Sequence, residues 1–354
     1  MFLKNLYSKL SLTIIVLLGS LNLHAQDPRF SQFYNAPLSI NPALTGVFDG
    51  EYRIAGAYRN QWNSVLGNKA FQTYGFSGDY RYNVTDNDYI GIGGQLINEK
   101  SGQGDLNRFQ ANLSGSFIKQ VGGSRYGTND QYLVAGLQMG MGQYSTDWGG
   151  YWFQRQFNET NLSVNPNESS GENGKARSNL YLDFNAGLLW YMVFDDRSSV
   201  YAGGSMMHLN TPKVSFFGEN NEGNSLYRRW LGHAGGEFLI TEYLSLLPSV
   251  YVMSQGPSFE TVVGSHIRYS NNDWQELSIR AGGWARINNR LGGQGLESII
   301  ASLTFEFDRW NFGLSYDINA SKLQTATNSR GAFEATAVYI AKENKRYRVK
   351  CPTF

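Results

Sequence analysis

The sequence contains very little cysteine and little proline. Its single cysteine, Cys351, has no second thiol to pair with, so no intramolecular disulfide holds the fold together. The 354 residues include only 8 prolines, but 40 glycines, 22 tyrosines, 21 phenylalanines and 8 tryptophans. Because aromatic residues favour strands and proline interrupts them, this composition is typical of a β-rich protein.

Long hydrophobic runs are also missing after residue 25. No stretch there reaches the roughly 18 uncharged apolar residues that would indicate a transmembrane helix. If the mature chain lies in a membrane, it must do so as a closed β-barrel, because only a closed ladder satisfies every backbone N–H and C=O group inside hydrocarbon. The charges are nearly balanced, with 30 Lys and Arg against 29 Asp and Glu, which argues against nucleic acid as a partner.

The first 25 residues have the pattern of an export signal. Lys4 and Lys9 precede an uncharged, mostly apolar run over residues 10–23, and the small residue Ala25 follows. This pattern predicts a secretory signal peptide that is cleaved before Gln26. The alternative is a membrane anchor helix, but the run is shorter than the roughly 20 residues that a spanning helix needs.

Beyond residue 50, apolar and polar residues alternate with the two-residue period of β-strands. Residues 310–319 are the clearest example, and residues 299–308 repeat the pattern with one interruption. Four charged residues lie on the faces opposite to the apolar ones, namely Arg280, Arg286, Glu306 and Asp317. A water-filled or polar-plugged lumen explains charges on these faces better than a dry core does.

The alternating segments predict about fourteen strands, an even number as in single-chain bacterial barrels. They cover residues 51–63, 70–83, 88–99, 105–119, 130–145, 177–195, 198–210, 228–241, 244–254, 259–271, 274–288, 296–307, 309–320 and 331–342. A soluble β-sandwich would also alternate, but its strands are usually shorter. The sequence therefore favours an all-β fold, an antiparallel β-barrel that spans the outer membrane.

The longest connections, over residues 146–176, 211–227 and 320–330, follow odd-numbered strands. Barrels place short turns on the periplasmic side and long loops outside, so both ends of this barrel are expected to be periplasmic. The connection over residues 121–129 is longer than this rule predicts. The expected parts of the chain are a signal peptide over 1–25, a periplasmic or plug segment over 26–50, the barrel over 51–342 and a periplasmic tail over 343–354.

The segment between the cleavage site and the first strand carries the most specific motif. It has three prolines and no strand period, so it is predicted to be an irregular plug or arm. Together with the start of the first strand and the carboxyl end, it resembles the PorP/SprF family of outer-membrane proteins from the type IX secretion and gliding machinery of Bacteroidetes. The residues that carry the resemblance are Phe30, Ser31, Gln32, Tyr34, Asn41, Pro42, Gly46, Arg59, Trp62, Cys351, Pro352 and Phe354.

The resemblance implies a barrel that associates with type IX secretion components in the periplasm and outer membrane. It also implies a role in exporting or anchoring large surface adhesins or other cargo. The family includes a general translocon component and paralogues dedicated to one adhesin, and the sequence leaves this choice open.

Aromatic residues in the loop over 146–176 are candidates for binding cargo, because aromatic side chains give a large contact area at modest entropic cost. They include Trp148, Tyr151 and Trp152. The alternatives are an aromatic girdle or packing within the loop. The basic tail over residues 342–350 is a second candidate surface, for periplasmic partners, although a solvated charged end is the simpler explanation.

Residues that would indicate an enzyme are not visible in the sequence. His208, His233 and His266 lie on different expected strands without the spacing of metal ligands, and no catalytic or phosphate-binding motif occurs. We therefore expect no catalysis, metal or cofactor. A reactive or intermolecularly linked Cys351 remains open, and the alternative function is a plugged outer-membrane channel for small or hydrophobic molecules.

Overall fold

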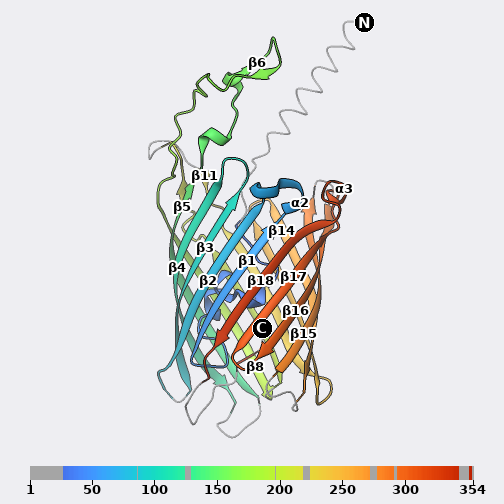
Figure 1. The fold of residues 1–354 in the computed structure, drawn as a ribbon. Helices are drawn as coiled ribbons and strands as arrows, with labels where there is room; N and C mark the ends of the chain where they lie inside the picture. The colour runs from blue at the N-terminus through green and yellow to red at the C-terminus, as the bar shows by residue number, and fades with distance from the viewer. Residues whose placement is uncertain are drawn as a thin grey trace, which may run out of the picture.

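The protein is a closed antiparallel β-barrel of fourteen strands (Figure 1). The computed structural model describes residues 27–85, 87–123, 129–195, 197–217, 224–271, 277–290, 293–342 and 351–352. The expected fold class is confirmed. The expected signal peptide and most of the basic tail lie outside the described residues.

The barrel strands lie close to the expected segments. They are β1 (Tyr52–Gln61), β2 (Phe71–Asn83), β3 (Asp88–Ser101), β4 (Leu106–Gly122), β5 (Asp130–Ser145), β8 (Tyr181–Asp195), β9 (Ser198–Met207), β12 (Arg229–Leu239), β13 (Leu244–Gln255), β14 (Ser258–Ser270), β15 (Leu277–Arg290), β16 (Gly293–Phe307), β17 (Trp310–Asn319) and β18 (Arg330–Ile340). The largest difference is at the start of β8, which was expected at residue 177. Arg177 makes only an isolated bridge to Ser145, so the continuous ladder begins later.

Each barrel strand pairs with its neighbours along the chain, and the ladder closes where β1 pairs with β18, from Arg53 opposite Ile340 to Gln61 opposite Ala332. Two short hairpins lie outside the ladder: β6 (Phe157–Asn158) with β7 (Ser163–Val164), and β10 (Lys213–Val214) with β11 (Asn224–Ser225). Closure leaves no barrel strand with a free edge, as hydrocarbon requires.

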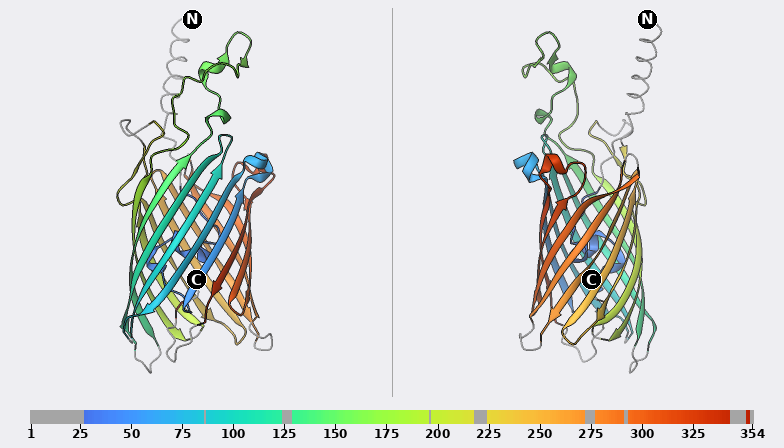
Figure 2. Two further views of the ribbon diagram at one scale, coloured as in Figure 1. Left: turned by 60° about the vertical axis from the view of Figure 1, so that its left-hand side comes forward. Right: turned by 90° about the vertical axis from the view of Figure 1, so that its right-hand side faces the viewer.

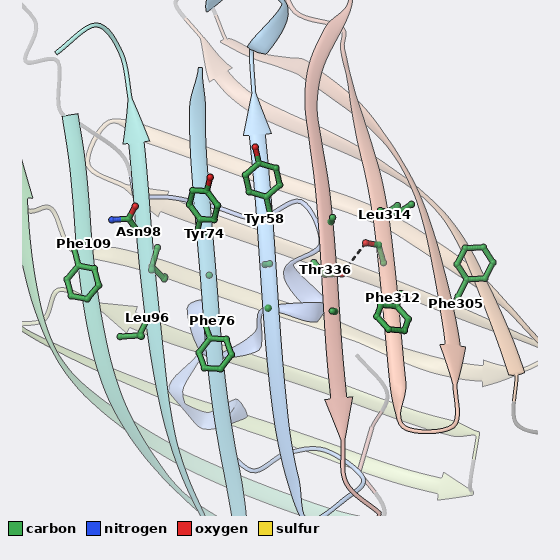
Figure 3. Close-up of a pocket in the computed structure, with 17 residues that line it drawn as sticks. Tyr58, Tyr74, Phe76, Leu96, Asn98, Phe109, Phe305, Phe312, Leu314 and Thr336 are labelled. Carbon is green, nitrogen blue, oxygen red and sulfur yellow. Dashed lines mark hydrogen bonds between the residues drawn. The ribbon is translucent and has the colours of Figure 1, made fainter. Parts of the chain in front are cut away.

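The two faces of the wall differ in polarity. On β17, Phe312 and Leu314 point outward and are exposed, whereas Ser315 and Asp317 point inward and are buried. Figure 3 shows the outer wall, where a shallow apolar groove of about 710 Å³ lies between aromatic side chains. An apolar outer face and a polar inner face are the pattern of a barrel that lies in lipid.

Among the described residues, no helix is long and apolar enough to cross a membrane. The short helices α2 (Asn63–Leu66) and α3 (Gln324–Thr327) belong instead to connections between strands. These connections, together with the long one over residues 146–180, lie at one end of the barrel, which we call the loop-side end (Figure 1). The chain enters β1 and leaves β18 at the opposite end. The unusual connection after β4 includes residues 124–128, which lie outside the described part.

The amino-terminal segment lies inside the barrel, as both views in Figure 2 show. It contains three 3₁₀ turns, η1 (Phe33–Asn35), η2 (Pro37–Ser39) and η3 (Pro42–Leu44). The side chain of Asn41 caps η3 by accepting a hydrogen bond from the N–H of Ala43. With prolines at the start of η2 and η3, the segment forms compact turns rather than a fifteenth strand.

A charge on the outer wall tests the membrane assignment. Replacing Leu314 by Arg should lower the unfolding free energy in lipid vesicles by about 2–4 kcal/mol, because the guanidinium would face hydrocarbon. Urea unfolding followed by tryptophan fluorescence measures the change. Leu323→Arg is the matched control, since Leu323 is similarly exposed, at 53% against 48% for Leu314, but lies in a connection at the loop-side end. Equal effects of the two variants would contradict the assignment.

Candidate functional site

Residues 27–48 cross the lumen from the loop-side end to the opposite end, and we call them the plug. The backbone N–H of Asp27 donates to Gln255, the last residue of β13, at 3.1 Å. The carbonyl of Phe48 accepts from Arg81, near the other end of β2, at 2.7 Å. Most plug residues are buried. The described residues of this segment therefore form a plug inside the lumen.

An ion-pair network, which we call the seam node, fastens the plug to the strands beside the barrel closure. Arg59 of β1 contacts Asp317 of β17 at 2.8 Å and Glu334 of β18 at 3.1 Å. Arg286 of β15 contacts the same Asp317 at 2.7 Å. Each of the four side chains is almost fully buried. The node therefore links four strands on both sides of the β1–β18 seam.

The plug completes this network. The Ser31 hydroxyl donates to Asp317 at 2.8 Å, and both guanidinium groups of the node also contact its oxygen. The backbone N–H groups of Ser31 and Gln32 each donate to one oxygen of Glu334, both at 2.7 Å. Because charge-assisted bonds of this kind are strong, the carboxylate of Glu334 holds the plug backbone and Arg59 at once.

A second network holds the first described residue of the plug at the loop-side end. The carboxylate of Asp27 contacts Arg108, Arg229 and His208, the last at 2.7 Å. The other ring nitrogen of His208 contacts Asp183 at 2.9 Å. Burial alone would lower the pKa of His208, but the two carboxylates outweigh this effect and raise it to about 9. His208 is therefore protonated at neutral pH and bridges the plug to β8.

Aromatic packing fills the middle of the lumen. Phe33 stacks on Tyr251 of β13 and meets Trp284 of β15 edge-on, with ring centroids 5.4 Å apart in both pairs. Tyr34 stacks on the same Trp284 and meets His266 edge-on at 4.7 Å. Aromatic pairs of this geometry add stability beyond that of the apolar area they bury. The plug is therefore held by aromatic packing as well as by ion pairs.

Toward the opposite end, the plug backbone lies directly against the wall. The N–H of Gly46 donates to Asp79, which also pairs with Arg53 at 2.7 Å. Gly46 has a φ of +75°, and a Cβ there would lie 2.8 Å from the Cα of Gly91 on β3. Both the left-handed backbone and the close approach require glycine. On the other wall, the Asn41 side chain donates to the carbonyl of Leu188 at 3.0 Å.

The structure brings most of the predicted motif residues into contact with the plug or its surroundings. Ser31, Gln32, Arg59, Arg286 and Asp317 meet in the seam node. The other two predicted lumen charges form a separate group, in which Arg280 pairs with Glu306 at 2.7 Å and Arg268 joins it at 2.8 Å. Pro42 and Phe30 belong to the buried plug, and the aromatic ring of Phe30 lies against Gly75.

Trp62 and the carboxyl-terminal residues lie at opposite ends of the barrel. Trp62 follows β1 at the loop-side end. The thiol of Cys351 lies 3.1 Å from a guanidinium nitrogen of Arg81 and packs against the lumen core, beside the buried Pro352. Phe354 lies outside the described residues. Burial disfavours a freely reactive Cys351 and raises the pKa of its thiol.

The predicted cargo-binding aromatics divide into two groups. Trp148 and Tyr151 pack within the connection, with Trp148 also contacting Phe216 and Phe217 of the next long connection at 5.9 Å. The backbone N–H of Lys175 bonds the carbonyl of Phe216 at 2.8 Å, so the two connections form one unit. Trp152 alone of the three is mainly exposed.

Several residues of the site were not singled out from the sequence, among them Asp27, Arg29, Arg108 and Glu334, and His208 was weighed only as a metal ligand. Glu334 lies on the polar face of the last strand, where it is fully buried. Inward alternation marks such residues as lumen-facing but does not reveal their partners. Among the described residues, no group of three His, Cys, Asp or Glu side chains is arranged to hold a metal ion.

Several solved structures match this chain at low sequence identity. A mutant of the TodX monoaromatic hydrocarbon channel matches with a TM-score of 0.50 and 13% identity, over 86% of this chain and 94% of that one. The Pseudomonas putida toluene transporter TodX matches with a TM-score of 0.49 and 11% identity, over 86% and 93%. CdiB from Escherichia coli matches with a TM-score of 0.46 and 10% identity, over 81% and 63%. No curated protein matches the sequence.

The fold and the filled lumen define an integral outer-membrane β-barrel with an internal plug. The family model for the type IX secretion system membrane protein PorP/SprF matches residues 22–339, almost the whole chain. The chain therefore belongs to the PorP/SprF family, and it is a membrane component of the type IX secretion system. The resemblance inferred from the plug motif is confirmed.

Removing the Glu334 carboxylate should loosen the plug. Glu334→Ala leaves Arg59 without one of its partners and two plug N–H groups unsatisfied, at a cost of about 3–5 kcal/mol. Trypsin cleavage after Arg29, which is protected while the plug is docked, should become faster. Glu237→Ala is the control, because this buried carboxylate pairs with Arg268 of the barrel wall at 3.1 Å. Unchanged protection in the Glu334 variant would show that the plug does not depend on the seam node.

Alkaline pH should loosen the loop-side end of the plug. His208 has a pKa of about 9 in the folded protein and about 6.5 when unfolded. Its stabilisation, on the order of 3 kcal/mol, is therefore complete below pH 6.5 and is lost as the pH rises through 9. In the native protein, the rate of trypsin cleavage after Arg29 should increase as the pH rises from about 6.5 to about 9. His208→Gln should remove the change, and an identical pH profile in this variant would contradict the assignment.

Proposed function

We propose that this barrel is an anchoring component of the type IX secretion and gliding machinery, which helps export or hold large surface adhesins or other cargo. The observation that supports this role is the plug. Because residues 27–48 fill the lumen and bond strands around it, the barrel in this state offers its rims rather than a pore. The partners would be cargo at the loop-side end and periplasmic secretion components at the opposite end.

The unit formed by residues 146–180 and 208–217 is the proposed cargo contact. It projects beyond the barrel (Figure 1) and exposes apolar side chains that have no role in the barrel itself. Leu162 at the tip of the β6–β7 hairpin is 77% exposed and has a φ of +51°. Its turn is held by Asn158 and Asn161, whose side chains accept bonds from the following N–H groups. A solvent-facing Leu and Trp152 suit a partner that covers them.

The opposite rim is the proposed periplasmic contact. The first strand, β1, begins there and the last strand, β18, ends there. The carboxyl-terminal residues Cys351 and Pro352 also lie there. The sequence of residues 342–350 is basic, with Lys342, Lys345, Arg346, Arg348 and Lys350, and this charge suits an acidic periplasmic surface.

A channel is the second candidate function. The TodX likeness concerns the fold only, and the lumen is lined by charged pairs such as Arg280 with Glu306, which suits polar rather than hydrophobic molecules. Conduction would require the plug to leave or shift. Single-channel recording in planar bilayers distinguishes the two roles, because an anchor with a docked plug should show no steady conductance.

Co-purification tests the anchoring role. The double variant Trp152→Ala, Leu162→Asp should reduce recovery of the cargo adhesin from native membranes at least tenfold, while recovery of periplasmic secretion components stays unchanged. Quantitative mass spectrometry of the affinity-purified complexes measures both. The control Val65→Asp alters another exposed apolar residue at the same end of the barrel. If the double variant recovers cargo as fully as the native protein does, the projecting unit is not the cargo contact.

A further inference from the structure

A separate cavity of about 310 Å³ lies at the loop-side end, and we call it the rim cavity. Its wall comes from the ends of β1, β15, β16, β17 and β18 and from the connection over residues 320–329. Arg286 and Asp317 of the seam node form part of its lining. The rim cavity is therefore open to solvent on one side and continuous with the charged network that holds the plug.

Trp62 lines this cavity in an unusual backbone conformation. Its φ of +61° and ψ of +27° are left-handed, which is rare for a bulky aromatic residue. The N–H of Trp62 donates to the carbonyl of Gly331 at 2.8 Å, and its ring packs edge-on against Phe71 at 5.3 Å. Backbone strain of this kind persists only where surrounding contacts enforce it. The fold thus fixes an indole at the cavity wall.

The remaining lining is dominated by groups that both donate and accept hydrogen bonds. It includes the carboxamides and hydroxyls of Gln61, Asn288, Asn289, Asn319, Ser298 and Ser321. The amide nitrogen of Asn288 donates to Glu297, but the amide oxygen is buried and has no hydrogen-bond partner among the described residues. Buried polar atoms are nearly always satisfied, so this oxygen is an exception beside the cavity.

The charges around the cavity largely cancel. Arg286 pairs with Asp317, and Glu297 pairs with Arg29 of the plug at 3.2 Å. Lys322 adds a further positive charge to the lining. With no strong excess of either sign, the cavity does not select a phosphate or a metal ion, and its polar lining does not suit a hydrocarbon.

We propose that the rim cavity binds a saccharide unit. A sugar presents hydroxyls that donate and accept in turn, which matches the carboxamides and hydroxyls of the lining, and an apolar ring face that matches Trp62. A peptide added as a strand is disfavoured, because the barrel strands around the cavity have both edges paired. The sugar can belong to a membrane glycolipid or to a free or cargo-borne glycan.

Saturation-transfer NMR on the full-length protein in detergent micelles tests this proposal. The probes are lactose, chitobiose and the core oligosaccharide released from lipopolysaccharide by mild acid. At least one should receive transfer from the native protein. Trp62→Ala and Asn288→Ala should each weaken its binding at least tenfold, whereas Trp230→Ala, a tryptophan change on the outer wall, should not. Heat-dependent migration on gels verifies that each variant is folded. If Trp62→Ala does not fold, Asn288→Ala alone tests the proposal.

The two sugar sources are separated by repeating the titration with intact lipopolysaccharide in nanodiscs. If the two substitutions weaken binding of the free oligosaccharide and of the glycolipid equally, the cavity binds the sugar unit that both share. If they weaken binding of the free oligosaccharide alone, the ligand is a soluble or cargo-borne glycan. The proposal is overturned if none of the three sugar probes binds the native protein. It is also overturned if a probe binds the Trp62→Ala and Asn288→Ala variants as well as it binds the native protein. None of these measurements requires cargo or another secretion component.

Discussion

The need to pair charges inside the barrel governs this structure. The inner wall carries arginines and carboxylates that burial would heavily destabilise if they were left alone. The plug supplies part of the required partners: Ser31 and Gln32 give N–H and hydroxyl groups to the seam node, and Asp27 gives a carboxylate to Arg108, Arg229 and His208. Wall and plug are therefore one electrostatic unit.

This dependence has a consequence for the role of the barrel. The seam node connects β1, β15, β17 and β18, so the plug also stabilises the strands that meet at the closure. A lumen filled in this way makes a rigid support for the loop-side unit and for the rim cavity. Both lie at the same end, where a surface protein or a glycan of the outer membrane would meet them.

The barrel itself was predictable because its physical cause is local. Each strand alternates lipid-facing and lumen-facing side chains, so a two-residue period along the sequence is enough to find it, as in residues 310–319. The same period places Arg280, Arg286, Glu306 and Asp317 on the face opposite to the apolar one, and all four are buried in the structure. The partners of these charges could not be predicted, because Arg59 and Glu334 are 275 residues apart and meet only when the ladder closes.

The aromatic loop shows the same division. Its composition indicated a contact surface, but only the folded chain separates Trp148, which packs against Phe216, from Trp152, which faces solvent. The plug motif indicated a family and an irregular segment, yet not that Asp27 lies at the loop-side end. By itself the sequence determined the strands, their two faces and the family, since these depend on neighbouring residues. The tertiary structure decided which charges pair and that the plug fills the lumen, because those contacts join residues that are distant in the sequence and meet only when the barrel closes.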